Sequence, residues 1–173
     1  MISKVFSIAE KNYRQWAPLF LRLAIGTGCI VHGWAKLSRG PATFGKLLLQ
    51  IGVPFSHVMA WITSLTELFG GLAILLGAFV SITAIPLIVT MLVAMFTIQI
   101  NYGFSSVKTI GLTPEGPVFG PPGYEINLLY IAGLIALMIT GAGVFSIDGW
   151  VVRSIYKLSD YDNFLLKQGN YDK

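Results

Sequence analysis

The residues of this chain that could do chemistry are a few ionisable side chains inside otherwise apolar stretches of sequence. They are Arg22, His32, Lys36, Glu67 and, at the edge of such a stretch, Glu125. An ionisable group inside a bilayer costs free energy, so each is a candidate for proton transfer or ligand binding. Each also has a structural alternative. Lys36 and Glu125 could extend to the lipid headgroups. Arg22 could do the same or pair with Asp148, and Glu67 could form a purely structural ion pair.

The composition places these side chains in a membrane protein. Of the 173 residues, 54% are hydrophobic and only 12% are charged, and the mean hydropathy is +0.70. Soluble domains contain roughly 25% charged residues. Because charges that flank apolar runs orient helices in a bilayer, the net charge of +4 does not indicate a nucleic-acid partner. The expected partner is the lipid bilayer.

The apolar runs predict an all-α fold, an integral membrane four-helix bundle. A span needs about 20 mostly apolar residues, and four segments meet this need: about 17–37, 58–80, 84–101 and 126–147. Pro86 is expected in the first turn of the third span, where its missing N–H is harmless. Only a few residues around Ser81 join the second and third spans, which predicts a tight antiparallel helix pair.

The distribution of Lys and Arg predicts the orientation of the bundle. Seven of them flank the spans on the face that carries both chain ends, and at most four flank the opposite face. The positive-inside rule therefore places both termini in the cytoplasm. The predicted membrane domain is 17–148. The tail 149–173 is expected to be cytoplasmic, with Asp148 as the N-cap of a short helix.

Three segments outside the spans have patterns of their own. Residues 1–16 place apolar side chains on one helical stripe, which predicts an amphipathic interfacial helix or, alternatively, a helix packed on a soluble partner. The outer loop 38–57 has apolar residues between Gly-Pro turns and predicts a short interfacial helix. The outer loop 103–123 is rich in Pro and Gly, which predicts neither helix nor strand. Its apolar residues indicate a folded cap.

His32, Lys36 and Glu67 are expected to approach one another in the outer half of the bundle. At about 1.5 Å of rise per residue, His32 and Lys36 lie near the outer end of the first span, and Glu67 lies deeper in the second. Side chains lean toward the N-terminus of their own helix, which brings the three groups toward one depth. The outer ends of the other spans add Gln99, Asn101, Glu125 and Asn127. We therefore predict one polar cluster, roofed by the Pro/Gly-rich loop.

Several short motifs in this region resemble the DoxX family. They are Arg22-Leu23 through Gly26, His32-Gly33-x-x-Lys36-Leu37, Glu67-Leu68-x-Gly70-Gly71 followed by Leu76-Gly77, Gly103-Phe104, Gly123-Tyr124-Glu125 and Gly143-x-x-Ser146-x-Asp148. The resemblance covers about residues 17–150; the two chain ends and 116–122 lie outside it. It implies a four-helix fold in a prokaryotic plasma membrane. It also implies an association with redox systems, since members resemble the small membrane subunit of thiosulfate:quinone oxidoreductase. A fold does not by itself establish a function.

Three functions from different classes are compatible with these features. The first is a quinone-linked membrane subunit of an oxidoreductase, to which a protein partner in a redox or respiratory complex supplies electrons. Its predicted catalytic residues are Glu67 and His32, and its predicted quinone ligands are His32, Lys36, Trp61 and Glu125. The second is a non-catalytic accessory subunit that anchors a larger membrane complex, and the third, less favoured, is a small carrier or channel. No metal site is predicted. The single cysteine, Cys29, is interpreted as a core residue and excludes an internal dithiol relay.

Overall fold

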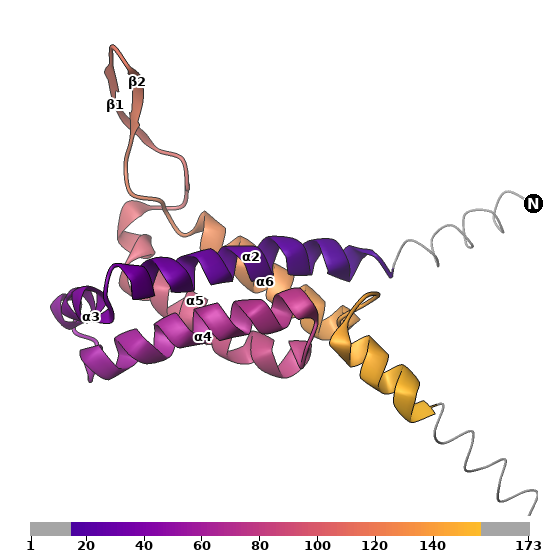
Figure 1. The fold of residues 1–173 in the computed structure, drawn as a ribbon. Coiled ribbons are helices and arrows are strands. Elements are labelled where there is room, and N and C mark those ends of the chain that lie inside the picture. The colour runs from indigo at the N-terminus through magenta and orange to yellow at the C-terminus, as the bar shows by residue number, and fades with distance from the viewer. Residues whose placement is uncertain (1–14, 157–173) are drawn as a thin grey trace, which may run out of the picture.

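The computed structural model describes residues 15–156. The amphipathic helix predicted at 1–16 therefore lies outside the described residues except for its last two positions, as does the tail after residue 156. The elements are, in chain order, α2 (Ala17–Ser38), α3 (Pro41–Gln50), α4 (Ser56–Leu76), α5 (Val80–Thr97), η1 (Gln99–Tyr102), β1 (Thr109–Thr113), β2 (Gly116–Phe119) and α6 (Glu125–Thr140). A further helical stretch covers 147–156. In Figure 1, α2 and α4 run side by side, α3 lies across one end of this pair, and α5 and α6 lie behind it.

The helices follow the predicted spans closely at some ends and not at others. α2 begins at Ala17 as predicted, and α3 is the short helix expected in the first outer loop. α5 begins at Val80, four residues before the predicted start, so Pro86 lies inside the helix and not in its first turn. That prediction was wrong because the chain reverses earlier, at Gly77. The φ of Gly77 is 69°, a left-handed value that suits a glycine at the end of α4.

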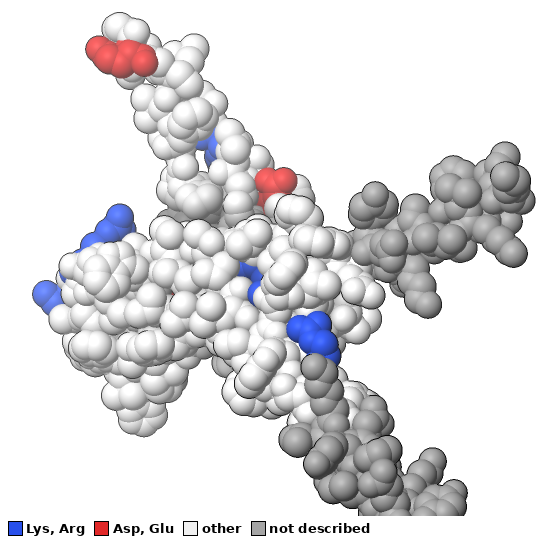
Figure 2. All heavy atoms as spheres, turned by 45° about the vertical axis from the view of Figure 1, so that its right-hand side comes forward, with Lys and Arg blue, Asp and Glu red and all other residues white. Residues whose placement is uncertain are grey.

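Apolar side chains cover much of the outside of the bundle. Within residues 15–156, α4 and α5 are long and apolar enough to cross a membrane, and α6 is a shorter apolar helix. Large hydrophobic side chains are exposed along all of these helices. On the face drawn in Figure 2, charged atoms are confined to a few positions and most of the bundle surface is uncharged. Contiguous apolar surface of this extent fits contact with lipid.

Small residues bring α2 and α4 into close contact. The buried residues of α2 include Arg22, Gly26, Cys29 and Gly33, and those of α4 include Ala60, Ser64, Glu67, Gly71 and Ile74. A Cβ added to Gly33 would lie 2.8 Å from the Ser64 carbonyl oxygen, so only glycine allows this approach. Steps of three and four residues repeat along both helices, as in a packed helix–helix seam. Lys36 follows Gly33 by three residues and so lies on the face of α2 that contacts α4. Glu67 lies on the contact face of α4, and the two charged side chains therefore meet.

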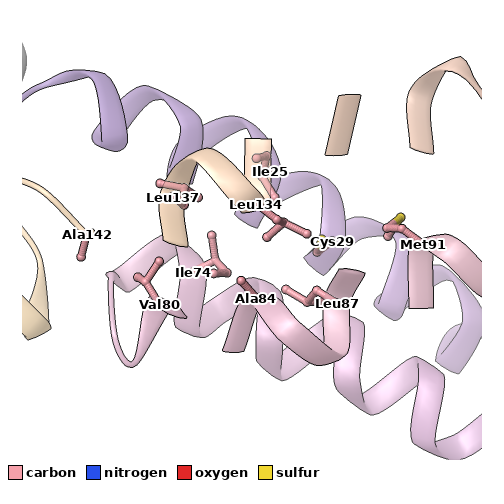
Figure 3. Close-up of a cluster of buried hydrophobic side chains, with 10 residues drawn as sticks. All are labelled: Ile25, Cys29, Ile74, Val80, Ala84, Leu87, Met91, Leu134, Leu137 and Ala142. Carbon is pink, nitrogen blue, oxygen red and sulfur yellow. The ribbon is translucent and has the colours of Figure 1, made fainter. Parts of the chain in front are cut away.

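All four long helices contribute to the hydrophobic core. Figure 3 shows its buried side chains, which are Ile25, Cys29, Ile74, Val80, Ala84, Leu87, Met91, Leu134, Leu137 and Ala142. Cys29 is fully buried among them, which agrees with its interpretation as a core residue. Because the core joins α2 and α4 to α5 and α6, it fixes the distance between α4 and α5 on which the site described below depends.

Arg22 ties three chain segments together at the end of the bundle opposite α3. Its side chain is 2% exposed. The guanidinium donates five hydrogen bonds of 2.7–3.1 Å to backbone carbonyls, those of Ile74, Leu75, Ala142, Val144 and Phe145. The last carbonyls of a helix carry partial negative charge, so the end of α4 stabilises this cation. The structure therefore shows neither a headgroup contact nor a hydrogen-bonded pair with Asp148 as the role of Arg22. We call its five bonds to backbone carbonyls the backbone lock.

Asp148 caps α5 and not the helix in which it lies. Its carboxylate accepts hydrogen bonds from the N–H groups of Phe79 at 2.7 Å and Val80 at 3.0 Å. The hydroxyl of Ser146 accepts the N–H of Gly149 at 3.1 Å, so Ser146 is the N-cap of the stretch 147–156. The predicted cap was wrong because Ser146 and Asp148 are both good capping residues. A contact between distant segments decides which helix each one caps.

The Pro/Gly-rich loop contains a β-hairpin, contrary to the prediction of neither helix nor strand. β1 and β2 pair antiparallel, with Leu112 opposite Pro117 and a bulge between Thr109 and Gly111. Proline is tolerated here because every strand of a two-stranded ribbon is an edge strand. The hairpin projects away from the bundle (Figures 1 and 2). At its base the carboxylate of Glu125 accepts the N–H of Ser106 at 3.0 Å.

Candidate functional site

A cavity of about 680 Å³ lies between α4 and α5, in the half of the bundle nearest α3. Its polar lining residues are His32, Lys36, Thr63, Thr66, Glu67, Thr90, Thr97, Gln99, Asn127 and Tyr130. Phe44, Leu48 and Val53 line it from α3 and the turn that follows. α3 therefore forms the roof that was predicted for the Pro/Gly-rich loop, none of whose residues 103–123 lines the cavity. That prediction was wrong because the hairpin extends outward and does not fold back.

An ion pair between Lys36 and Glu67 lies in the wall that α2 and α4 form. Lys36 Nζ donates to Glu67 Oε2 at 2.5 Å. The Glu67 side chain is 3% exposed and that of Lys36 is 24% exposed. Lys36 Nζ also lies 5.0 Å from the centre of the Phe44 ring, a favourable position for a cation over an aromatic face. The pair places two charged groups in the cavity wall, with the Glu67 side chain buried and the Lys36 side chain partly exposed.

His32 and Tyr130 extend this polar wall across α2 and α6. His32 precedes Lys36 by one helical turn, so both side chains share a face of α2. The rings of His32 and Tyr130 meet edge to face, with centres 6.4 Å apart and planes at 71°. A Cβ at Gly28 would overlap the Tyr130 hydroxyl, so this glycine makes the room that Tyr130 occupies. The wall therefore carries an imidazole and a phenol, both able to donate or accept hydrogen bonds.

Two buried side-chain oxygens among the lining residues have no hydrogen-bond partner within residues 15–156. They are Gln99 Oε1 and Asn127 Oδ1. Asn127 is 2% exposed, and its Nδ2 donates to the carbonyl of Met91 at 3.2 Å. A carbonyl can only accept, so this bond sets the orientation of the amide and leaves Oδ1 as the unpaired atom. An unpaired buried acceptor costs about 1–3 kcal/mol. Both oxygens have less than 1 Å² of accessible surface, so they are covered by neighbouring protein atoms and are not presented to the cavity.

The cavity opens on the flank of the bundle between α4 and α5. Several of its lining residues are also about half exposed on the outer surface, namely Ile62, Ile85, Val89 and Val93. Pro86 lies among them inside α5, where a proline removes one hydrogen bond of the helix. The mouth is thus apolar and faces the side of a membrane protein that contacts lipid. A molecule dissolved in the bilayer could enter without crossing a polar surface.

The structure brings three of the predicted site residues together and places two elsewhere. His32, Lys36 and Glu67 all line the cavity. Trp61 is 52% exposed and is not a lining residue, and Glu125 anchors the hairpin base. Sequence reasoning missed Tyr130. It follows Asn127 by three residues, and two polar side chains at that spacing in an apolar span share one face, a signal that could have identified it.

Comparison with known proteins identifies the family. Residues 17–100 match the family model DoxX. These residues are a DoxX domain. The matched region includes α2, α3, α4 and α5, and with them the Lys36–Glu67 pair and the mouth of the cavity. The predicted resemblance to the DoxX family is thereby confirmed over this region, whose helices α4 and α5 are long and apolar enough to cross a membrane.

One relative extends the likeness beyond the DoxX domain. The chain is 26% identical over 140 residues to an uncharacterized protein of Haemophilus influenzae. The alignment covers 80% of this chain and 92% of the relative. No solved structure matches the chain. The chemistry of the site therefore has to be argued from its own residues, and among those described no group of three or more His, Cys, Asp or Glu side chains could hold a metal ion.

Proposed function

We propose that this DoxX-family protein binds a quinone in the cavity between α4 and α5, as the membrane subunit of a redox system. The observation that carries the proposal is the Lys36–Glu67 pair in the wall of an apolar cavity that opens toward lipid. A volume of about 680 Å³ lies within the roughly 300–1,000 Å³ of small-molecule sites. It would hold a quinone ring and the first part of its tail, with the rest of the tail in the bilayer.

The lining side chains are suited to bind a quinone oxygen and to exchange protons with it. Lys36 and His32 would donate hydrogen bonds to a quinone oxygen, and Glu67 would exchange a proton with it through Lys36 or His32. A histidine suits this role because its ordinary pKa is close to neutral pH. Reduction of a quinone takes two electrons and two protons, and a partner redox protein would supply the electrons. Trp61 and Glu125 have no part in this proposal because they lie outside the cavity lining.

We further propose that α2, α4, α5 and α6 cross a prokaryotic plasma membrane as four spans, with both termini in the cytoplasm. The length and apolar character of α4 and α5 support two of these crossings. α2 has 22 residues, enough for a third. α6 with the following segment would form the fourth. An even number of crossings returns the chain to the face from which it started. Labelling of cysteines introduced at residues 16 and 156 in intact cells would test this topology.

Quinone binding can be tested with a photoreactive benzoquinone analogue on the full chain in lipid nanodiscs. We expect crosslinks in peptides of α4 and α5 that an excess of unmodified quinone removes. Val89→Trp should block the mouth and abolish labelling. Ile82→Trp, on the same helix and also exposed but outside the lining, should leave labelling unchanged. Labelling that is spread over all lipid-facing peptides, or that survives Val89→Trp, would refute the proposed site.

An accessory role is the second candidate, and the hairpin is the observation that favours it. Ile110, Leu112, Val118 and Phe119 are all exposed on a ribbon that projects from the bundle. A subunit that anchors a soluble partner would use such a surface, since exposed apolar patches mark interaction sites. Deleting 107–121 should then release co-purifying proteins without altering the Lys36–Glu67 site. If the partner remains bound while Glu67→Gln abolishes quinone turnover, the first function holds and this one fails.

A further inference from the structure

The helical stretch 147–156 leaves the bundle at the end opposite α3 and has apolar side chains on most of its surface. In Figure 1 this stretch, at the yellow end of the colour range, points away from the other helices. Its large apolar residues are all exposed, by 40% to 70%, and none belongs to the hydrophobic core: Ile147, Trp150, Val151, Val152, Ile155 and Tyr156. Apolar surface of this extent marks a contact that the described residues do not make with one another.

The helical spacing leaves one polar strip on this stretch. Side chains four residues apart lie above one another on a helix, so the stretch has four rows of side chains. Three of these rows carry apolar side chains, and the fourth consists of Gly149 and Arg153. A Cβ added to Gly149 would lie 3.8 Å from Nη2 of Arg153, so the guanidinium stays within this strip. The stretch is therefore an amphipathic helix with a wide apolar side and a narrow polar one.

Two caps fix where this stretch begins, at the level where α4 turns into α5. Ser146 Oγ accepts the N–H of Gly149 at 3.1 Å, and the carboxylate of Asp148 accepts the N–H groups of Phe79 and Val80. Val80 is the first residue of α5. Because α5 is proposed to cross the membrane from this residue onward, the stretch leaves the bundle at a surface of the bilayer.

Exposed aromatic side chains gather at the same end of the bundle. Phe79 and Phe145 are both exposed, and the ring of Trp16 packs edge to face on that of Phe145, with centres 5.5 Å apart. Trp150 and Tyr156 continue this series along the stretch. Trp and Tyr are enriched where a membrane meets water, because the ring is apolar while its N–H or O–H stays hydrated. The apolar surface of the bundle is thus continuous with that of the stretch.

We propose that the stretch 147–156 lies on the bilayer surface as an interfacial helix. Its apolar rows enter the acyl chains, and the strip of Gly149 and Arg153 faces water and the lipid phosphates. A protein groove covers one face of a helix, whereas lipid can cover three of its rows. The first part of the predicted cytoplasmic tail 149–173 is then bound to the membrane. This inference rests on the proposed crossings of the membrane and is independent of quinone binding.

A polarity-sensitive fluorophore can test this placement on the full chain in lipid nanodiscs that contain no other protein. It would be attached to single introduced cysteines, and the parent chain, whose Cys29 is fully buried, gives the background. We expect Val151→Cys and Ile155→Cys to show blue-shifted emission and quenching by spin-labelled lipids. Arg153→Cys should instead be quenched by iodide in the water. Val151→Asp should expose a label at residue 155 to iodide, whereas the control Arg153→Lys should not.

A further label separates this inference from the proposed crossings. Phe69 is exposed on α4 and lies outside the cavity lining, so Phe69→Cys should be quenched by the spin-labelled lipids. Lipid quenching at residue 69 together with iodide quenching at 151 and 155 would overturn the interfacial helix and leave the crossings standing. Labels at 151 and 155 that neither quencher reaches would also overturn it, because protein would then cover this face. No lipid quenching at residue 69 would overturn both.

Discussion

Lys36→Met should destabilise the protein more than Glu67→Gln, although the two side chains form a single ion pair. Without Lys36, the Glu67 carboxylate stays 3% exposed and has lost its cation. Removing one partner of a buried pair costs about 3–5 kcal/mol, and we expect about 3 kcal/mol because Glu67 borders a cavity. Without the Glu67 charge, Lys36 is 24% exposed and keeps the Phe44 ring. Since glutamine retains an acceptor, this loss should be about 1 kcal/mol.

The double variant Lys36→Met/Glu67→Gln supplies the decisive value. It should cost about 2 kcal/mol less than the sum of the two single variants, because the unpaired carboxylate is gone. The free energies of unfolding would be measured by denaturant titration in mixed lipid–detergent micelles, followed by tryptophan fluorescence. Lys46→Met, at an exposed position on α3, is the control and should change little. A cost for Glu67→Gln that equals or exceeds that for Lys36→Met, or strict additivity, would refute the reasoning.

Three other substitutions test the contacts that hold the bundle, each by the same unfolding measurement. Arg22→Lys cannot reproduce five hydrogen bonds with three donors, and should cost about 2–4 kcal/mol; a neutral result would contradict the backbone lock. Asp148→Ala removes the cap of α5 and should cost about 1 kcal/mol, whereas no change would mean that water replaces the carboxylate. Gly33→Ala forces α2 away from α4 and should cost about 1–3 kcal/mol. The control Gly111→Ala, where an added Cβ meets nothing within 4 Å, should be neutral.

The helices and the charged pair could be predicted because they depend on regular spacing. The start of α2 follows from an apolar run and a proline in its first turn. Lys36 and Glu67 could be brought to one depth from the helical rise and the lean of side chains alone. Neither step needs knowledge of a third segment. The roles assigned to these residues in catalysis remain predictions, since the geometry places them together without showing a reaction.

The features that could not be predicted depend on contacts between distant segments. Asp148 caps a helix that begins almost 70 residues earlier, and no local pattern indicates this. Pro86 looks like a first-turn proline until the position of the reversal at Gly77 is known. The hairpin was missed because its Pro and Gly residues occupy edge and turn positions, where a ribbon tolerates them. The unpaired oxygen of Asn127 becomes visible only when the Met91 carbonyl is in place.

The bonds of Arg22 also set an order of events during synthesis. Ala142, one of its five acceptors, lies 120 residues further along the chain. At roughly 5–20 residues per second, the ribosome needs about 6–24 seconds to make that length. The two carbonyls at the end of α4 lie 52 and 53 residues after Arg22, so they are made within this interval. From then until its end the guanidinium can find only these two, because the other three do not yet exist. α2 and α4 are thus joined provisionally, and the later segment 142–145 completes the set of bonds.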